Sequence, residues 1–350
     1  MQSYIFLLSG DCPDLAFSEL RCVINSLFGG RKIERLHERL ASTSLEERGA
    51  KKVSSRLSYT KLIGQLICLC EVKDASDVLT RSYIPVNPSE SFAFRAIKLD
   101  KSVSIPSPVI ERMLGGVIAA KGFRVSLKKP DRLIIGIIYK GRIAVAVLVS
   151  EPSKEAIFEA REPSKRPFFH PSSMRPRLAR CIVNLSCCGP GSIIIDPFCG
   201  VGGIMIEAGI LGYRTVGIDL DWDMLMGAKE NLRYYRVYDY DLICGDASKP
   251  PLRSGFGCVI TDPPYGRGAS TYGKRHSDLI IQMLESIMPM QAVIVTYMGS
   301  RLEESVGRLG FEVAETHRIK VHRSLTRIIL RLVRKHVDKV SGDIRHSSNR

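Results

Sequence analysis

Apolar positions in the second half of the chain change regularly between two spacings. Short apolar runs typical of buried strands alternate with segments whose apolar residues recur every three or four positions, as in helices. We expect strands at Ser192–Phe198, Arg214–Leu220, Asp241–Asp246, Phe256–Asp262, Gln291–Tyr297, Phe311–Glu315 and Leu325–Arg331. We expect helices near Gly203–Leu211, Trp222–Tyr235, His276–Ile287 and Ser300–Arg308. This alternation predicts an α/β fold, a doubly wound and mainly parallel seven-stranded sheet with helices on both faces.

The first 150 residues have a less regular pattern, which predicts an α+β region. The expected elements are a strand at Tyr4–Leu8, a helix near Asp14–Leu27, an apolar run at Lys61–Val72, a strand at Phe92–Lys98, a helix at Ser107–Ala120, a strand at Arg124–Leu127 and a hairpin over Leu133–Val149 that turns at Lys140 and Gly141. Residues 151–170 are rich in proline and charge and predict a linker. Helical spacing resumes over Ser172–Cys187.

Charge is distributed unevenly along the chain. The net charge is +15, and Lys and Arg outnumber Asp and Glu by 30 to 18 in residues 1–180 but only by 21 to 18 in the remainder. Such an excess favours a polyanionic partner, since each neutralised phosphate releases counterions. A generally solvated basic surface explains the charge equally well.

The apolar fraction of 45% and the charged fraction of 25% are those of a globular protein. Ten cysteines lie mostly inside apolar runs and form no paired CxxC motifs, which favours buried reduced thiols and argues against a metal site or a disulfide framework. The first residues lack the basic segment of a signal peptide, and the longest apolar run is broken by Lys140 and Arg142. We therefore expect a cytoplasmic protein that does not enter a membrane.

Acidic residues close three successive predicted strands. Asp196 precedes a glycine-rich turn with Gly200 and Gly202 that leads into a helix, and its spacing differs from the dinucleotide pattern GxGxxG. Asp219 ends the next strand and could accept from both hydroxyls of a ribose. Asp246 follows the third strand and could accept from an adenine amino group. Because parallel strands end at one edge of the sheet, these acids together outline an adenosine pocket.

The fourth strand ends in the sequence DPPYG, residues 262–266. The carboxylate of Asp262 and the carbonyl of Pro263 are two acceptors, which match the two donors of an exocyclic amino group. Pro263 and Pro264 restrict the backbone, so these acceptors are fixed in advance, and Tyr265 offers a flat ring on which a base could stack. The motif indicates chemistry on the amino group of a nucleobase.

At these motifs the chain resembles a known family. DPFCGVGG, GIDLD, GDA and DPPYG resemble the class I S-adenosylmethionine-dependent methyltransferases that act on amino groups, and residues 166–185 resemble the segment that enters the catalytic domain of archaeal tRNA guanine-N2 methyltransferases. The resemblance implies a Rossmann-like catalytic domain at 171–335, preceded by a ferredoxin-like domain at 1–75, a THUMP RNA-binding domain at 76–150 and the linker at 151–170. Residues 336–350 would form a flexible basic tail.

The resemblance also assigns roles to individual residues. The cofactor S-adenosylmethionine would contact His170, Asp196, Phe198, Gly200, Gly202, Asp219, Asp246 and Ala247. The catalytic corner would comprise Asp262, Pro263 and Tyr265, with Pro264 and Gly266 beside the target base. Lys128, Lys129 and Arg132 are candidates for contacts with tRNA phosphates. Since some relatives require a small activating subunit, such a partner is one alternative to a monomer.

Two other functions fit the same residues. The acceptor pair would also serve an amino-group methyltransferase that acts on ribosomal RNA, DNA or a protein glutamine, although the basic front half argues against a protein target. A different class is a non-catalytic RNA-binding protein that retains a methyltransferase fold. The intact DPPYG motif and the three placed carboxylates argue against that loss of activity.

Overall fold

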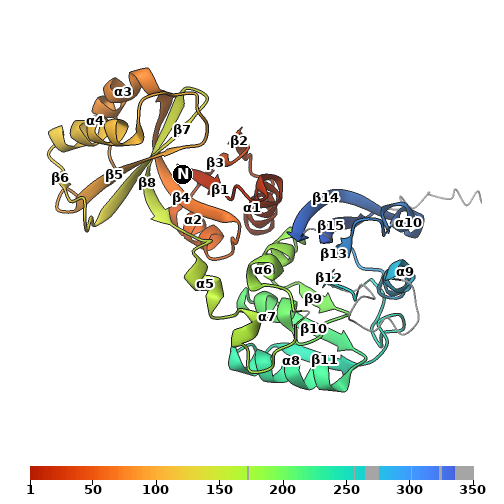
Figure 1. Ribbon diagram of the computed structural model, residues 1–350. Helices are drawn as coiled ribbons and strands as arrows, with labels where there is room; N and C mark the ends of the chain where they lie inside the picture. The colour runs from red at the N-terminus through yellow and green to blue at the C-terminus, as the bar shows by residue number, and fades with distance from the viewer. Residues whose placement is uncertain (172, 256, 265–275, 301, 323–324, 336–350) are drawn as a thin grey trace, which may run out of the picture.

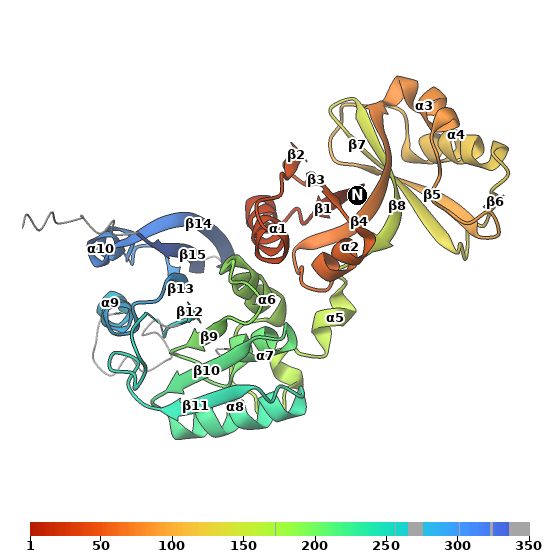
Figure 2. The same ribbon diagram turned by 180° about the vertical axis from the view of Figure 1, so that it is seen from behind.

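The computed structural model describes residues 1–350 except 172, 256, 265–275, 301, 323–324 and 336–350. It consists of two lobes, each built around one sheet (Figure 1, Figure 2). The segment between the lobes contains the short helix α5 (Glu155–Glu159).

The amino-terminal lobe contains an eight-stranded sheet in the order β2-β3-β1-β4-β8-β7-β5-β6. The pairs are antiparallel apart from β5, which runs parallel to β6 and β7. The elements of this lobe are β1 (Gln2–Leu8), α1 (Pro13–Phe28), β2 (Glu34–His37), β3 (Leu40–Leu45), α2 (Glu47–Ser54), β4 (Thr60–Glu71), α3 (Ala75–Arg81), β5 (Ser91–Lys98), α4 (Ser107–Ala120), β6 (Arg124–Val125), β7 (Arg132–Tyr139) and β8 (Arg142–Ser150).

Most of the expected elements in this lobe are present, and the hairpin turns where we predicted. Lys140 and Gly141 both have positive φ, 47° and 74°, as a two-residue turn between twisted strands requires. The sequence pattern missed β2, β3, α2 and α3, each of which is only four to eight residues long. The division expected at residue 75 does not interrupt the sheet, because β4 pairs with β1 on one side and β8 on the other.

The carboxyl-terminal lobe contains a seven-stranded sheet in the order β11-β10-β9-β12-β13-β15-β14. Neighbouring strands are parallel from β11 to β13, and β15 is antiparallel to both of its neighbours. The elements are α6 (Pro176–Leu185), β9 (Ile193–Asp196), α7 (Gly203–Ile210), β10 (Arg214–Asp219), α8 (Trp222–Tyr234), β11 (Tyr240–Cys244), β12 (Cys258–Thr261), α9 (His276–Ile287), β13 (Gln291–Tyr297), α10 (Leu302–Val306), β14 (Phe311–His322) and β15 (Leu325–Arg334).

This arrangement confirms the predicted Rossmann-like α/β fold. Apolar side chains of α6 and α7 pack on one face of the sheet, and those of α9 and α10 pack on the other. Burying such aliphatic side chains contributes about 1.5–3 kcal/mol each to folding. The prediction for β14 was too short, because the strand continues along β15 to His322 with charged residues among its apolar ones.

The two lobes are joined by buried polar contacts as well as by the connecting segment. Glu19 of α1 is fully buried, and its carboxylate accepts hydrogen bonds from Ser58 N and Oγ at 2.9 and 2.6 Å, from Tyr59 N at 2.7 Å and from Asn184 Nδ2 of α6 at 2.8 Å. Burial raises the pKa of Glu19, although these hydrogen bonds oppose the shift. A buried carboxylate with four donors fixes α1 against α6.

The connecting segment is anchored on the carboxyl-terminal lobe. Glu207 of α7, which is fully buried, pairs with Arg161 at 2.6 Å and with Arg180 at 2.7 Å. Arg166 is also buried, and its Nε donates to the carbonyl of Arg161 at 3.1 Å. The second half of the predicted linker therefore packs as part of the carboxyl-terminal lobe.

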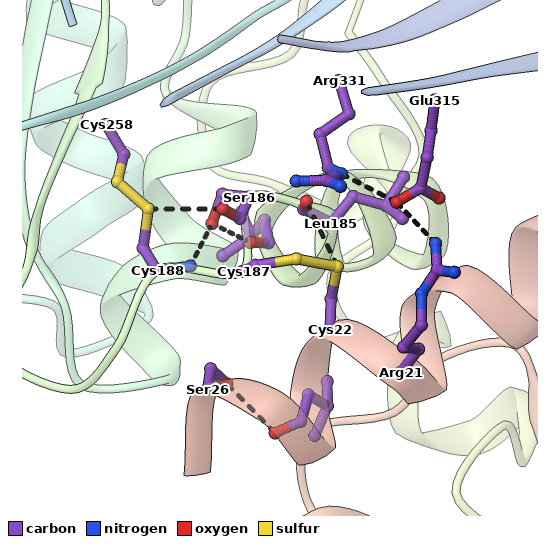
Figure 3. The surroundings of a disulfide bond; sticks show 12 residues. Arg21, Cys22, Ser26, Leu185, Ser186, Cys187, Cys188, Cys258, Glu315 and Arg331 are labelled. Atoms are coloured by element: carbon purple, nitrogen blue, oxygen red, sulfur yellow. Dashed lines mark hydrogen bonds and ion pairs between the residues drawn. A yellow bond between two sulfur atoms is a disulfide. The ribbon is translucent and has the colours of Figure 1, made fainter. Parts of the chain in front are cut away.

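The prediction that the cysteines are all reduced is wrong. Cys22 of α1 forms a disulfide with Cys187, and Cys188 forms one with Cys258 at the start of β12 (Figure 3). The partners are separated by 165 and 70 residues, so no local spacing could reveal them. The first disulfide joins the two lobes beside the ion pairs of Glu315 with Arg21 and Arg331.

The described residues bear on the expectations about a membrane span and a metal site. Within the described residues, no helix has the length and apolar character that a membrane span needs. The same residues contain no group of three His, Cys, Asp or Glu side chains arranged to hold a metal ion. The predicted tail at 336–350 lies outside the residues that the structure describes.

Candidate active site

Four acidic residues lie in a row along one edge of the seven-stranded sheet. Asp246, Asp219, Asp196 and Asp262 follow or end β11, β10, β9 and β12, which are neighbours in that order. Because these strands are parallel, their carboxyl ends share the edge where ligands of doubly wound sheets bind. The structure thus places these acids at the ends of adjacent strands, whose arrangement can be followed in Figure 1.

The turn after β9 is built from glycines in the left-handed region. Gly200 and Gly202 have φ of 49° and 79°, conformations that side chains other than glycine's rarely adopt. Gly202 caps α7, and the amide of Gly200 donates to Asp219 Oδ2 at 2.8 Å. Phe198 is half-buried beside this turn and packs against the face of the sheet that α9 covers. The backbone is thereby held close to the sheet edge.

Asp196 lies at the centre of the row and is buried, with 1% of its surface exposed. Its Oδ1 accepts a hydrogen bond from the hydroxyl of Thr261 at 2.7 Å and from the amide of Phe198 at 3.3 Å. Burial raises the pKa of Asp196 to about 7, aided by the negative charges of Asp219 and Asp262 and opposed by these hydrogen bonds. A buried carboxylate with this pKa favours a cationic ligand, which would stabilise its ionised form.

Asp219 and Asp246, at the ends of β10 and β11, are held by backbone amides. Asp219 accepts from the amide of Asp221 at 3.0 Å in addition to that of Gly200, and burial raises its pKa. Asp246 accepts from the amide of Ser248 at 2.8 Å, and Ala247 between them is buried. These carboxylates are oriented acceptors, as a ligand rich in hydroxyl and amino donors requires.

The segment with Phe168 and His170 is fixed next to the glycine turn. The amide of Phe168 donates to Asn231 Oδ1 at 3.0 Å, while Asn231 Nδ2 donates to the carbonyls of Phe168 and Val201 at 3.0 and 3.1 Å. The ring of Phe168 occupies the space that a side chain at Gly227 would need. His170, half-buried, therefore follows a segment that one asparagine ties to the glycine turn.

The turn directly after β12, which we call the corner and which is described over residues 262–264, carries the fourth acid. Asp262 is partly buried, Pro263 is buried and Pro264 is half-buried. Asp262 Oδ2 lies 3.4 Å from Arg327 Nη2 of β15, and both side chains are about equally buried, at 15% and 16% exposed. Tyr265 and Gly266 of the predicted corner lie outside the described residues.

The carbonyl of Pro264 is held by His276, the first residue of α9. His276 is buried, with Nδ1 2.9 Å from Pro264 O and Nε2 2.9 Å from Thr296 Oγ1 of β13. Since a carbonyl only accepts, Nδ1 carries the proton, and Nε2 of the neutral ring accepts from the Thr296 hydroxyl. Burial lowers the pKa of His276, opposed by the hydrogen bond to Pro264. The corner is therefore supported from α9 and β13.

Sequence reasoning missed both supports of the corner. Arg327 and His276 lie 65 and 14 residues after Asp262, on elements that meet it only in the folded sheet. The sequence contained one usable signal, a cationic residue inside the apolar run of β15, where a buried charge requires a partner. The histidine had no partner at metal or triad spacing, and its role depends on tertiary contact.

The basic candidates lie far from this edge. Lys128 and Lys129 are exposed and follow β6, which is at the end of the amino-terminal lobe remote from the catalytic sheet (Figure 1, Figure 2). Arg132 is exposed as well, but its Nε pairs with Glu90 at 2.9 Å. The structure does not bring these residues to the row of acids.

The residues of the edge fit the donor set of S-adenosylmethionine. The molecule carries an ammonium group, two ribose hydroxyls and an adenine amino group, and the edge offers Asp196, Asp219 and Asp246 in line as acceptors. The glycine turn supplies backbone close to these acids. Donors and acceptors are therefore complementary along the edge.

Comparison with known proteins adds sequence relationships. Residues 163–329 match the model of a family described as RMKL-like, methyltransferase domain. The chain is 36% identical over 333 residues to the tRNA (guanine(10)-N2)-dimethyltransferase of Methanothermobacter thermautotrophicus, covering 92% of this chain and 97% of that protein. It is 28% identical to the protein of the same name from Methanocaldococcus jannaschii, covering 93% and 97%.

Solved structures share the fold over nearly the whole chain. TrmN from Thermus thermophilus superposes with a TM-score of 0.58 at 18% identity, covering 95% of this chain and 99% of that one. SMU.472, described as a putative methyltransferase complexed with SAH, gives a TM-score of 0.54 at 16% identity, covering 96% and 99%. With its full-length similarity to the archaeal enzymes and its matching catalytic domain, the chain belongs to the family of S-adenosylmethionine-dependent tRNA (guanine-N2) methyltransferases.

Proposed function

We propose that this protein transfers methyl groups from S-adenosylmethionine to the exocyclic N2 of guanosine in tRNA, at position 10, and that it adds up to two of them. The names of the relatives supply the position and the number of methyl groups. The observation that carries the proposal is the row of acids, in which Asp262 continues the line of Asp246, Asp219 and Asp196. A base held at Asp262 would thus lie beside a cofactor held at Asp196.

Each acid on the cofactor side has a separate role in this proposal. Asp196, with Phe198, Gly200, Gly202 and His170, would hold the methionine portion. Asp219 would bind the ribose hydroxyls, and Asp246 with Ala247 the adenine. The bound cofactor supplies a methyl group already activated by its sulfonium. The protein's contribution is therefore to align the acceptor nitrogen with that methyl group and to exclude water.

On the target side, Asp262 and the Pro263 carbonyl would accept hydrogen bonds from the N2 amino group. The lone pair of that nitrogen is delocalised into the guanine ring, so it is a poor nucleophile. Two acceptors draw the amino group out of conjugation and stabilise the positive charge that develops on nitrogen. Tyr265, with Pro264 and Gly266, would stack on a base that has left its helix.

The amino-terminal lobe would bind tRNA, as the expected ferredoxin-like and THUMP domains would. The support is its excess of positive charge and the exposure of Lys128 and Lys129. The Lys128→Ala, Lys129→Ala double variant should weaken tRNA binding and reduce the salt slope of log K by about 2. Lys51→Ala is the control, because Lys51 is paired with Glu47 at 2.6 Å in the same lobe. Equal slopes for both variants would remove these two lysines from the interface.

The reaction is tested with labelled cofactor and defined RNAs. We expect methyl transfer to a tRNA transcript, mapped by mass spectrometry to guanosine 10, and no transfer when inosine replaces that guanosine, since inosine lacks the N2 amino group. Transfer to ribosomal RNA or DNA in preference to tRNA would overturn the substrate assignment. Failure to bind the cofactor in calorimetry would revive the non-catalytic alternative. We expect a cytoplasmic monomer, and activity that appears only with a small activating subunit would contradict this.

A further inference from the structure

Arg327 reaches the acidic corner from two strands away. In the sheet order β12-β13-β15, its register partner on β13 is Tyr297, at the end of that strand. From this position its Nη2 approaches Asp262 Oδ2 to 3.4 Å. Its Nε is buried and has no hydrogen-bond partner among the described residues. A guanidinium that gives up solvent in this way requires a stabilising anion, and among the described residues Asp262 is the carboxylate paired with it.

A neighbouring carboxylate, Asp196, disfavours the charge of Asp262. Asp196 on β9 is close enough for the two negative charges to affect each other, and Thr261 directly before Asp262 is bonded to Asp196. His276 on α9 is buried, bonded to Pro264 O and 5.1 Å from the ring of Tyr297 on β13. Among these neighbours of the corner, Arg327 supplies the permanent positive charge.

We propose that Arg327 is a positioning residue that keeps Asp262 ionised and its carboxylate turned toward the target amino group. This inference rests on the proposed function, in which Asp262 accepts from N2. Arg327 binds one carboxylate oxygen, and a carboxylate has lone pairs for about four donors, so the amino group can share the same acid.

The chemistry explains why the ionised form matters. The bond from N2 to the methyl carbon forms while the bond from that carbon to sulfur breaks, and the sulfur keeps the electron pair. The nitrogen gains positive charge, which is relieved when one of its protons passes to the carboxylate and on to solvent. A protonated Asp262 could neither stabilise that charge nor take up the proton.

The same strand provides a matched control. Arg331 lies on the same face of β15 as Arg327, with 17% of its side chain exposed against 16%. It also pairs with a carboxylate, Glu315 on β14, at 2.8 Å. Replacing either Arg327 or Arg331 therefore removes a largely buried arginine from β15, but of the two only Arg327 contacts Asp262.

The test is the pH dependence of kcat/KM for tRNA, measured with the full-length enzyme at saturating cofactor. In the wild type, kcat/KM should fall at low pH as Asp262 is protonated. Arg327→Met should move this acidic limb of the pH profile to higher pH by about 1 unit, because an adjacent arginine lowers the pKa of an aspartate by about 1–3 units. Arg327→Lys, which keeps the charge, should restore most of this shift, and Arg331→Met should leave the limb in place. Cofactor affinity and the midpoint of thermal unfolding are recorded for each variant to identify misfolded protein.

Each result has a defined consequence. A uniform loss of activity in Arg327→Met with an unmoved limb would show that Arg327 has only a structural role, and an unchanged enzyme would also overturn the inference. Asp262→Asn separates this inference from the proposed function. If Asp262→Asn is inactive while Arg327→Met has a normal limb, only the role of Arg327 fails. If Asp262→Asn stays active, the assignment of Asp262 itself fails.

Discussion

The two halves of the acidic edge hold their carboxylates in different ways. On the β11-β10-β9 side, Asp246 and Asp219 each accept a hydrogen bond from the backbone amide two residues further along the chain. On the β12 side, Asp262 contacts the arginine of a distant strand, and the carbonyl of Pro264 is bonded to a buried histidine. Asp196 lies between them, and Thr261 of β12 donates to it.

This difference follows the task of each half. Backbone amides orient an acid without a countercharge, which leaves its negative charge available to a ligand with cationic and hydroxyl groups. A carboxylate that must stay ionised while charge changes on its substrate benefits from a permanent cation nearby. The comparison therefore predicts that the cofactor half governs affinity and the target half governs turnover.

The largest effect is expected for Asp262→Asn. The variant should lose methyl transfer by at least about a hundredfold, the cost typical of removing one electrostatic contact in a transition state. Its affinity for S-adenosylmethionine should stay within a factor of about 2. Single-turnover kinetics and calorimetry measure the two quantities. Turnover above a tenth of that of the wild type would contradict the prediction that the target half of the edge governs turnover.

Asp196→Asn should have the next largest effect, and it should fall on affinity. Loss of a charge-assisted hydrogen bond costs about 1.5–3 kcal/mol, which corresponds to roughly 10- to 100-fold weaker cofactor binding. Because the pKa of Asp196 is about 7, wild-type affinity should rise as the pH increases through neutrality, with release of a proton on binding. The variant should lose this dependence. Calorimetry in buffers of different ionisation enthalpy counts the protons, and a pH-independent wild type would contradict the assignment.

His276→Phe tests the supports of the target half. It removes the hydrogen bonds to Pro264 and Thr296. Because the bond that holds the Pro264 carbonyl contributes about 0.5–1.5 kcal/mol, kcat should fall roughly 2- to 10-fold, with little change in cofactor affinity. Thr296→Val should reproduce part of the loss. The pKa of His276 is lowered by burial, so its neutral form stabilises the fold, and this stability should be lost as the pH falls below the ordinary value of 6.5. Loss of cofactor affinity in place of kcat would reverse the proposed division.

The sequence predicted one half of the edge better than the other. Asp196, Gly200, Gly202 and Asp219 belong to strand–turn–helix units whose spacing is visible in a continuous stretch, and the structure places them together. Strand order, the supports Arg327 and His276, and the disulfide of Cys22 with Cys187 depend on contacts between distant segments. No periodicity encodes such contacts, because each partner alone looks like an ordinary residue of its own element.

The smallest effect on catalysis is expected for the contact that fixes the target half to the amino-terminal lobe. Glu315 of β14 pairs with Arg331 of β15 at 2.8 Å and with Arg21 of α1 at 2.7 Å (Figure 3). Burial alone would raise the pKa of Glu315, but hydrogen bonds from His317 and Ser18 and the charges of Arg21 and Arg331 bring it below its usual range. A carboxylate with a lowered pKa stabilises the fold above its unfolded-state pKa of about 4.5 and loses that contribution as the pH falls below it.

Glu315→Gln should therefore lower the free energy of unfolding at pH 7 by about 1.5–3 kcal/mol, the range for hydrogen bonds to charged groups. As the pH falls below about 4.5 the difference from the wild type should shrink, because the unfolded chain takes up a proton on Glu315 while the folded protein keeps this carboxylate ionised. Urea unfolding at several pH values measures this, with Glu47→Gln as a control at an exposed pair that should change little. Since Glu315 lies away from the row of acids, kcat and cofactor affinity of the folded variant should equal those of the wild type. A reduced kcat at full stability would mean that the contact of α1 with β14 also sets the geometry of the Asp262 corner.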